Sequence, residues 1–295
     1  MYDIKNTFNA KTVDEAIKYL SENPASVLLC GGTDVMIRLK ARKLKEASLV
    51  YIREISEIKG VELEDDGTIV IGAATCFDDI YRNEICRKYI PILSDACNTV
   101  GSPQIRNIGT IGGNLCNGAV SADSVPSLYA LDAVLEIRSV RGTRMIPVTQ
   151  FHTGPGKTVL EADEMLVCVR IPKSSYENYG GCYIKFGQRN SMEISTLGCA
   201  ATVRLSEDKK TVDTLRIAFG VAAPTPVRCV KLENQVKGMA VGDGLYDLIS
   251  ANVLSELNPR DSWRASKELR EQLIRTLAVR AVKQAAANVG GKTDV

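Results

Sequence analysis

Two glycine-rich segments of the 295-residue sequence carry residue types that bind phosphate groups without a lysine. The first is VLLCGGTD at 27–34, and the second is TIGGN at 110–114, inside the nearly neutral stretch 101–118. Glycines let a backbone adopt positive φ and approach a ligand closely, so that consecutive N–H groups converge on an anion. Thr33 and Thr110 add neutral hydrogen-bonding groups. Either these segments are two ordinary tight turns, or together they form one anion-binding site.

Other nucleotide-binding patterns fit poorly. A dinucleotide fingerprint requires G-x-G-x-x-G, but Gly154 and Gly156 are followed by Val159 where the third glycine belongs. The string FHTGPGKT at 151–158 is similar to the end of a phosphate-binding P-loop, yet Phe151 stands where its first glycine belongs. A kinase or nucleoside triphosphatase is therefore not indicated.

Metal-dependent and hydrolytic chemistry has little support in the sequence. His152 is the sole histidine, and a lone histidine is more often structural than catalytic. The nine cysteines are odd in number and show no C-x-x-C spacing, which argues against a zinc site or an iron–sulfur cluster. These absences favour a bound organic cofactor that supplies the reactive group.

The composition is that of a globular protein with 45% hydrophobic and 24% charged residues. The net charge is +2 without a basic stripe, so nucleic acid is not an expected partner. No apolar run reaches the roughly 18 residues that a membrane span needs. The N-terminal residues lack the apolar core of a signal peptide, and we expect a cytoplasmic protein.

The hydrophobic patterns predict a mixed α+β protein. A capping box at Thr12–Glu15 opens a helix, and a long helix at 263–289 carries a Leu269, Leu273 and Leu277 stripe, a Glu271–Arg275 pair and a stop at Gly290. Further helices are expected at 34–43, 78–100 with a break near Pro91, 121–133 and 244–257. Strands are expected at 26–32, 48–55, 68–75, 134–148 as a hairpin, 165–172, 182–189, 197–205 and 214–222. The polar connector at 173–181 marks a domain boundary.

Several long strings in the sequence resemble the FAD-binding (medium) subunits of the molybdenum hydroxylases, among them those of bacterial xanthine dehydrogenases. The likeness covers essentially the whole chain. The strings are LLCGGTDV (28–35), GSPQIRNIGTIGGNLCNGAVSADS (101–124), FHTGPGKT (151–158), ISTLGCAA (194–201), AFGVAAPTPVRC (218–229) and SWRASKELR (262–270).

The resemblance implies a fold with two domains. Residues 1–176 would form an FAD-binding domain of the vanillyl-alcohol-oxidase (PCMH) type, with subdomains at about 1–56 and 57–176. Residues 177–295 would form a smaller domain similar to the C-terminal domain of carbon monoxide dehydrogenase flavoproteins, in which an antiparallel sheet packs against helices.

The resemblance also implies which residues bind FAD. Both glycine-rich segments would hold its pyrophosphate, Asp123 its nucleotide portion, Leu166 its adenine end and Lys185 a further part, while Ile194 would lie near the flavin ring. For Asp123 a helix N-cap, and for Leu166 and Ile194 an ordinary core position, stay open as alternatives. The complete set of expected cofactor-binding residues is Val27, Leu28, Leu29, Cys30, Gly31, Gly32, Thr33, Asp34, Thr110, Ile111, Gly112, Gly113, Asn114, Asp123, Leu166 and Lys185.

The implied function is electron transfer during xanthine or hypoxanthine oxidation. The subunit would receive electrons from a small subunit with [2Fe-2S] clusters and pass hydride to NAD, while a large molybdopterin subunit oxidises the purine in a higher-order heteromer. FAD would be bound non-covalently, with neither His152 nor Cys116 bonded to it. A nicotinate, carbon monoxide or aldehyde hydroxylase subunit, a stand-alone flavin oxidase and a non-catalytic binding module remain alternatives.

Overall fold

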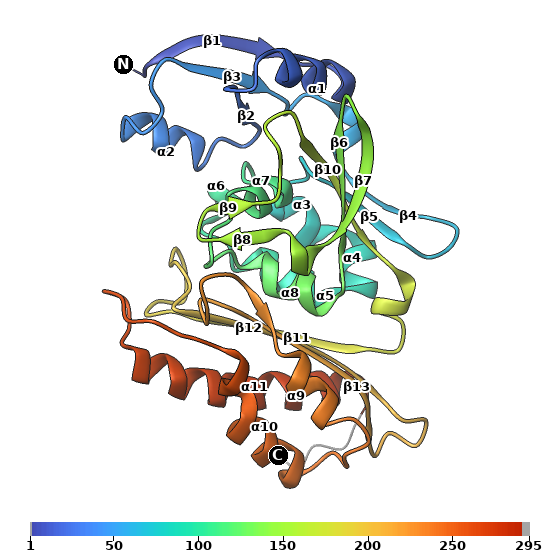
Figure 1. Ribbon diagram of the computed structural model, residues 1–295. Helices are drawn as coiled ribbons and strands as arrows, with labels where there is room; N and C mark the ends of the chain where they lie inside the picture. Colours follow the sequence, from blue (N-terminus) through green and yellow to red (C-terminus); the bar gives the residue numbers. More distant parts are fainter. Residues whose placement is uncertain (1, 291–295) are drawn as a thin grey trace.

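The structure is a computed structural model that describes residues 2–290, and it stacks three α+β units in chain order (Figure 1). The first unit contains the N-terminus, the second unit forms the middle, and the C-terminal unit lies at the opposite end. This arrangement confirms the α+β class. No helix in residues 2–290 has the length and apolar character needed to cross a membrane.

The first unit is a small parallel sheet with two helices. Its strands are β1 (Ile4–Asn9), β2 (Val27–Leu29) and β3 (Ala47–Tyr51), in the order β1-β3-β2. Helix α1 (Val13–Glu22) supplies the crossover that parallel strands need, and Thr12 caps it by accepting the N–H of Glu15. Helix α2 (Val35–Lys40) follows β2. Strand β2 is only partly buried, and it is shorter than the predicted strand 26–32.

The second unit is a five-stranded antiparallel sheet in the order β4-β5-β10-β6-β7. Its strands are β4 (Val61–Leu63), β5 (Ile69–Gly72), β6 (Val134–Ser139), β7 (Gly142–Pro147) and β10 (Met165–Ile171). The predicted helical stretch 78–100 is three helices, because Asn83 caps a new helix and Pro91 opens another. The helices are α3 (Phe77–Arg82), α4 (Glu84–Tyr89), α5 (Pro91–Asn98), α6 (Pro103–Arg106), α7 (Ile111–Cys116) and α8 (Ser124–Ala130). A small ribbon of β8 (His152–Gly154) and β9 (Lys157–Thr158) lies beside them.

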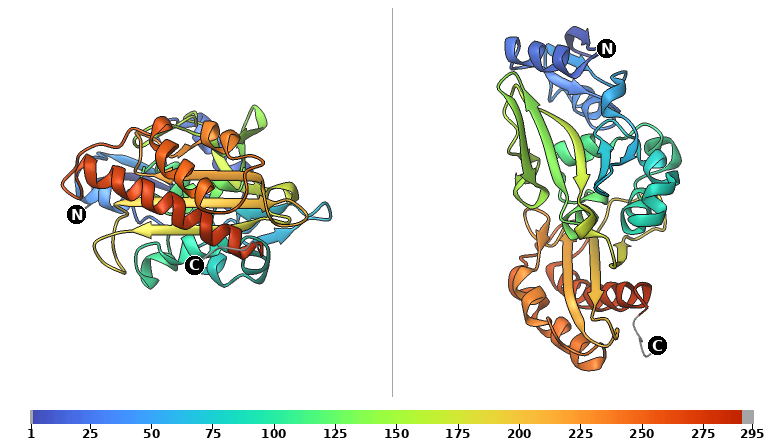
Figure 2. Two further views of the ribbon diagram at one scale, coloured as in Figure 1. Left: turned by 90° about the horizontal axis from the view of Figure 1, so that it is seen from below. Right: turned by 90° about the vertical axis from the view of Figure 1, so that its right-hand side faces the viewer.

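The C-terminal unit is an antiparallel sheet covered on both faces. Its strands are β11 (Gly180–Phe186), β12 (Leu197–Leu205), β13 (Val212–Gly220) and β14 (Val227–Arg228), in chain order. Helix α11 (Lys267–Asn288) runs across one face, with α9 (Val230–Gln235) and α10 (Asp243–Asn252) nearby (Figure 2). Helices α5 and α8 of the second unit pack on the other face. The expected boundary at 176/177 lies in the connector between β10 and β11 and stays a prediction.

Two details of the predicted long helix are wrong. Leu269 is exposed, whereas Leu273 and Leu277 are buried, so the three leucines do not form one buried stripe. Arg275 does not pair with Glu271, and its guanidinium donates to the backbone oxygens of Ser250 and Ala251 in α10. A tertiary backbone contact therefore replaces the expected surface ion pair.

Candidate functional site

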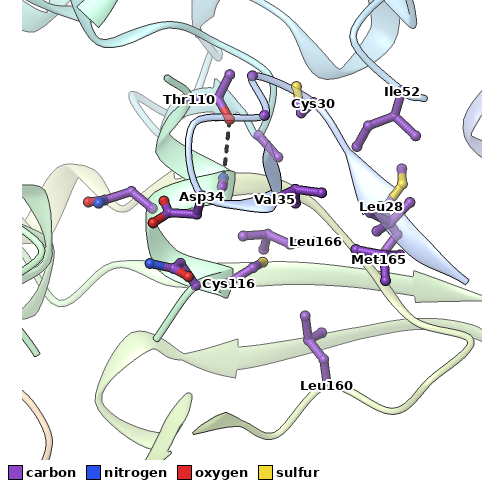
Figure 3. Close-up of a pocket in the computed structure, with 18 of the residues that line it drawn as sticks. Leu28, Cys30, Asp34, Val35, Ile52, Thr110, Cys116, Leu160, Met165 and Leu166 are labelled. Carbon is purple, nitrogen blue, oxygen red and sulfur yellow. Dashed lines mark hydrogen bonds between the residues drawn. The ribbon is translucent and has the colours of Figure 1, made fainter. Parts of the chain in front are cut away.

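A cleft between the first and second units brings the two glycine-rich segments together. Its volume is about 660 Å³, within the range of cofactor-sized pockets, and the first segment, the start of α7 and the start of β10 line it (Figure 3). The expected residues that line the cleft are Val27, Leu28, Cys30, Gly31, Gly32, Thr33, Asp34, Thr110, Gly112, Gly113, Asn114 and Leu166.

The two segments touch at Gly31. A β-carbon on this residue would lie 2.0 Å from the carbonyl oxygen of Ile108, so only glycine permits the contact. Arg53, just after β3, donates to the backbone oxygens of Asn107 (3.2 Å) and Ile108 (3.3 Å). The close approach and the arginine bridge fix the position of one segment against the other.

The first segment presents unused backbone donors. It turns at Gly32, whose φ of 76° favours glycine, and then enters α2. Among the described residues 2–290, the N–H groups of Gly32, Thr33 and Asp34 have no protein acceptor. Successive unpaired N–H groups at a turn before a helix are suited to an anion. The segment therefore has the amide donors that the sequence predicted.

The second segment differs from the prediction. TIGGN is not a free turn but the start of α7, capped by the hydroxyl of Thr110, which accepts the N–H of Gly113 at 3.2 Å. The N–H groups of Ile111 and Gly112 donate to Thr75 and Ala73, and that of Asn114 donates to Thr110. Protein acceptors already occupy these amides, so they are not free donors, and binding of the anion by this segment stays a prediction. The segment presents glycine surfaces and two polar side chains instead.

Charged and polar side chains complete one end of the cleft. Arg38 on α2 and Asn117 after α7 both line it, and the sequence reasoning missed both. Burial raises the pKa of the Asp34 carboxyl, while the Arg38 guanidinium and the Asn117 side chain oppose the shift. Arg38 follows Asp34 by one helical turn, and that spacing in the predicted helix was the available signal.

Apolar side chains form the other part of the cleft. Leu28, Ile52 and Met165 lie together at one end, while Leu166 and Leu160 lie nearer the polar end (Figure 3). Such a wall suits a flat organic ring, which gains from leaving water. The cleft thus combines an anion-binding end with an apolar surface, and this combination fits a dinucleotide such as FAD.

The thiols and the histidine near the cleft are not reactive groups. Burial raises the pKa of Cys116 to about 12, so this thiol stays protonated at neutral pH. Burial also raises the pKa of Cys30. The ring of His152 lies 3.1 Å from the Leu115 carbonyl oxygen and 3.2 Å from the Tyr129 hydroxyl, and it does not line the cleft. This histidine therefore has a structural place, as a lone histidine more often does.

Asp123 and Lys185 form a buried ion pair outside the cleft lining. Lys185 Nζ lies 2.8 Å from an Asp123 carboxylate oxygen and 2.9 Å from the Thr99 carbonyl oxygen, next to the cleft residue Val100. Asp123 also accepts from the hydroxyls of Tyr183 and Ser195. Burial raises its pKa, and the ammonium of Lys185 opposes this. Although Asp123 stands at the N-cap of α8, its side chain makes no cap bond.

Three other expected residues lie elsewhere. Ile111 is fully buried in the core, and Leu29 packs inside the first unit beside Leu39 and Leu49. Ile194 is half exposed on the segment between β11 and β12, so the core alternative for this residue is wrong. None of the three lines the cleft in the described part of the chain.

Known proteins share both the sequence and the fold. Residues 183–285 match the family described as the CO dehydrogenase flavoprotein C-terminal domain. The chain is 43% identical over 292 residues to the xanthine dehydrogenase FAD-binding subunit of Escherichia coli O157:H7, with 99% of each chain covered. It is 29% identical over 278 residues to the carbon monoxide dehydrogenase medium chain of Hydrogenophaga pseudoflava, covering 94% of this chain and 95% of that one.

Structural similarity extends over the same length. A solved carbon monoxide dehydrogenase from Hydrogenophaga pseudoflava matches with a TM-score of 0.92 at 27% identity, covering 98% of this chain and 99% of that one. The resemblance that the sequence motifs indicated is confirmed. Since residues 3–174 match the family described as the FAD binding domain in molybdopterin dehydrogenase, the chain belongs to that family.

Proposed function

We propose that this chain is the FAD-carrying electron-transfer subunit of a molybdenum hydroxylase of the xanthine dehydrogenase type. It would take electrons from a [2Fe-2S] subunit and deliver hydride to NAD, while a molybdopterin subunit oxidises xanthine or hypoxanthine. The 43% identity to the Escherichia coli subunit over nearly the whole chain supports this choice. Bound FAD supplies a group that accepts single electrons and releases them in pairs.

The contact between Gly31 and Ile108 is the observation that carries the cofactor assignment. It holds the free N–H groups of Gly32, Thr33 and Asp34 beside Thr110 and α7, as a site for the pyrophosphate. Arg38 adds a positive charge to the same end. In this proposal Thr110 and Asn114 contribute side chains rather than amides, and Gly112 and Gly113 provide a close backbone surface.

The remaining residues have supporting roles in this proposal. Leu166 packs against the apolar part of the cofactor. Lys185 keeps a positive charge near the cleft, and Asp123 holds its ammonium in place at 2.8 Å. Ile194, which does not line the cleft, would lie near the flavin ring. FAD would be held without a covalent bond, since Cys116 stays a protonated thiol and His152 does not line the cleft.

The experiment has two arms. The isolated chain is mixed with FAD, and retained flavin is measured by absorbance after gel filtration. The chain is then combined with its [2Fe-2S] and molybdopterin subunits, and NAD reduction is followed with xanthine, hypoxanthine or nicotinate as substrate. We expect retained FAD and NAD reduction with a purine. Nicotinate turnover alone would favour the alternative suggested by 35% identity over 205 residues to the nicotinate dehydrogenase FAD-subunit of Eubacterium barkeri. A colourless chain would overturn the cofactor assignment.

A further inference from the structure

Two segments meet at one end of the C-terminal sheet. Residues 187–196, between β11 and β12, lie beside residues 258–266, which precede α11, in both Figure 1 and Figure 2. Gln188 Nε2 donates to the Arg264 carbonyl oxygen at 3.2 Å, and Arg270 Nε donates to the Thr196 carbonyl oxygen at 3.4 Å. We call this region, residues 187–196 and 258–270, the Trp263 corner.

The Trp263 corner contains a buried cation without a carboxylate. Arg270 is 2% exposed, and its guanidinium donates to neutral acceptors only: the carbonyl oxygens of Thr196 and Arg260 and the hydroxyl of Ser262. Among residues 2–290, no Asp or Glu lies within ion-pair distance of it. Buried charges are normally paired, because burial without a partner is costly. Within the described residues, the guanidinium of Arg270 therefore has no carboxylate as a direct partner.

Two further arginines increase the imbalance. Neither Arg260 nor Arg264 forms an ion pair within the described part of the chain, and the buried Nε of Arg264 has no acceptor there. Burial and the charges of Arg260 and Arg264 lower the pKa of Arg270, and the charge of Asp261 opposes this shift. Asp261 thus offsets part of this imbalance, while Glu193 in the same corner pairs with Arg189. The corner therefore favours a negatively charged neighbour.

An exposed aromatic anchor accompanies these charges. Trp263, the only tryptophan, is 81% exposed, and the Arg264 guanidinium covers its ring at 4.2 Å from the centroid. On the neighbouring segment, Met192 is 65% exposed and Ile194 is 50% exposed. Tryptophan and arginine are the residue types that dominate the binding energy of protein interfaces. Exposed apolar side chains beside unpaired cations are typical of such an interface.

We propose that the Trp263 corner is a docking surface for an acidic segment of another subunit of the assembled enzyme. Carboxylates of that segment would pair with Arg264 and Arg260, and an apolar side chain would cover Trp263. A free inorganic anion would satisfy the arginines but leave Trp263 and Met192 exposed, so a protein segment fits the surface better. The inference rests on the proposed function, because it needs a multi-subunit enzyme.

The test compares subunit binding by three variants. The FAD-loaded chain and the variants Trp263→Ala, Arg264→Glu and Lys210→Glu are titrated against the tagged partner subunits, and Kd is measured at low and high salt. Lys210 is the control, since its side chain is 80% exposed in the turn at the opposite end of β12. We expect Kd to rise about tenfold or more for the two corner variants and not for the control. Arg264→Glu should also weaken the salt dependence of binding. Because Trp263 is exposed, the FAD content and Tm of Trp263→Ala should stay unchanged.

Each other result overturns the inference. If the corner variants bind the partner subunits as tightly as wild type does, the Trp263 corner is not a docking surface. If Arg264→Glu weakens only the binding of pyrophosphate or NAD, the corner is a small-anion site. If the variants change only the sedimentation of the isolated chain, the corner joins two copies of this chain. A wild-type chain that binds FAD but no partner subunit overturns both the inference and the proposed function. The results above, in which only the corner variants differ from expectation, overturn the inference alone.

Discussion

The Ile108 carbonyl oxygen occupies the space where a β-carbon on Gly31 would stand, only 2.0 Å from that position. The two glycine-rich segments, far apart in the sequence, can thus touch because Gly31 has no side chain. The Arg53 guanidinium bonds to that same carbonyl oxygen from the first unit. The geometry of the cleft therefore depends on how closely the Gly31 backbone of the first unit approaches the Ile108 carbonyl of the second unit.

Gly31→Ala should separate the two segments. The added methyl group collides with backbone atoms that cannot rotate away, so the segments must move apart, and overpacking of this kind costs about 1–3 kcal/mol. We expect FAD affinity to fall about tenfold or more, measured as a Kd by flavin fluorescence. Gly244→Ala is the control, since its β-carbon would meet nothing within 4 Å. A Gly31→Ala chain that binds FAD like wild type would contradict the proposed clamp.

Gly112→Val and Gly113→Val should fail in different ways. A β-carbon on Gly112 would lie 2.7 Å from the Ala73 carbonyl oxygen, so this variant should lower the Tm of the FAD-free chain. A β-carbon on Gly113 meets only the Thr110 hydroxyl, at 3.0 Å, and the longer valine side chain enters the cleft. Gly113→Val should therefore lose FAD with a smaller change in Tm. A fully yellow Gly113→Val protein would show that FAD does not lie against this residue.

Lys185→Met should lower the free energy of unfolding, because it leaves the buried Asp123 carboxylate without its cation. Removing one partner of a buried ion pair costs about 3–5 kcal/mol, because the other charge is left without compensation. Urea unfolding should show this loss, while the double variant with Asp123→Asn should recover part of it. A double-mutant cycle for FAD affinity tests the role of the pair at the cofactor. An unchanged flavin potential and unchanged NAD reduction in Lys185→Met would refute a role for Lys185 near the flavin.

Stability should fall in mild acid because of His152. Burial lowers the pKa of this histidine in the folded chain below 6.5, so the unfolded chain binds the proton more readily. The stability that neutral His152 contributes to the folded chain is fully present above pH 6.5 and is lost as the pH falls below that value. We expect a smaller free energy of unfolding at pH 5.5 than at pH 7.5. His152→Gln should reduce this pH dependence, and an identical decline in both proteins would refute the assignment.

The sequence motifs predicted the class of fold and the pairing of the glycine-rich segments, since both depend on local patterns. The capping box at Thr12 predicted the start of α1 to the residue. The use of the amides of Ile111 and Gly112 was not predictable, because their acceptors Thr75 and Ala73 come from the loop after β5. Local sequence cannot reveal which backbone groups a distant loop occupies.

Side-chain environments were the least predictable part. The SWRASKELR string identified Arg270 as part of a family motif but not as a buried cation, since that depends on Thr196 and Arg260 meeting it. The sequence places Arg38 one helical turn after Asp34. However, only the position of α2 beside the cleft makes Arg38 a lining residue. Burial is a tertiary property, and one sequence gives it only for regular amphipathic elements.

Strand β10 lies between β5 and β6 at the centre of its sheet, although both neighbours precede it in the chain. It also supplies Met165 and Leu166 to the cleft. A growing polypeptide therefore synthesises both glycine-rich segments well before the strand that joins the two halves of the sheet. The cleft is complete only once β10 has been synthesised, and a nascent chain halted earlier exposes two strand edges to its neighbours.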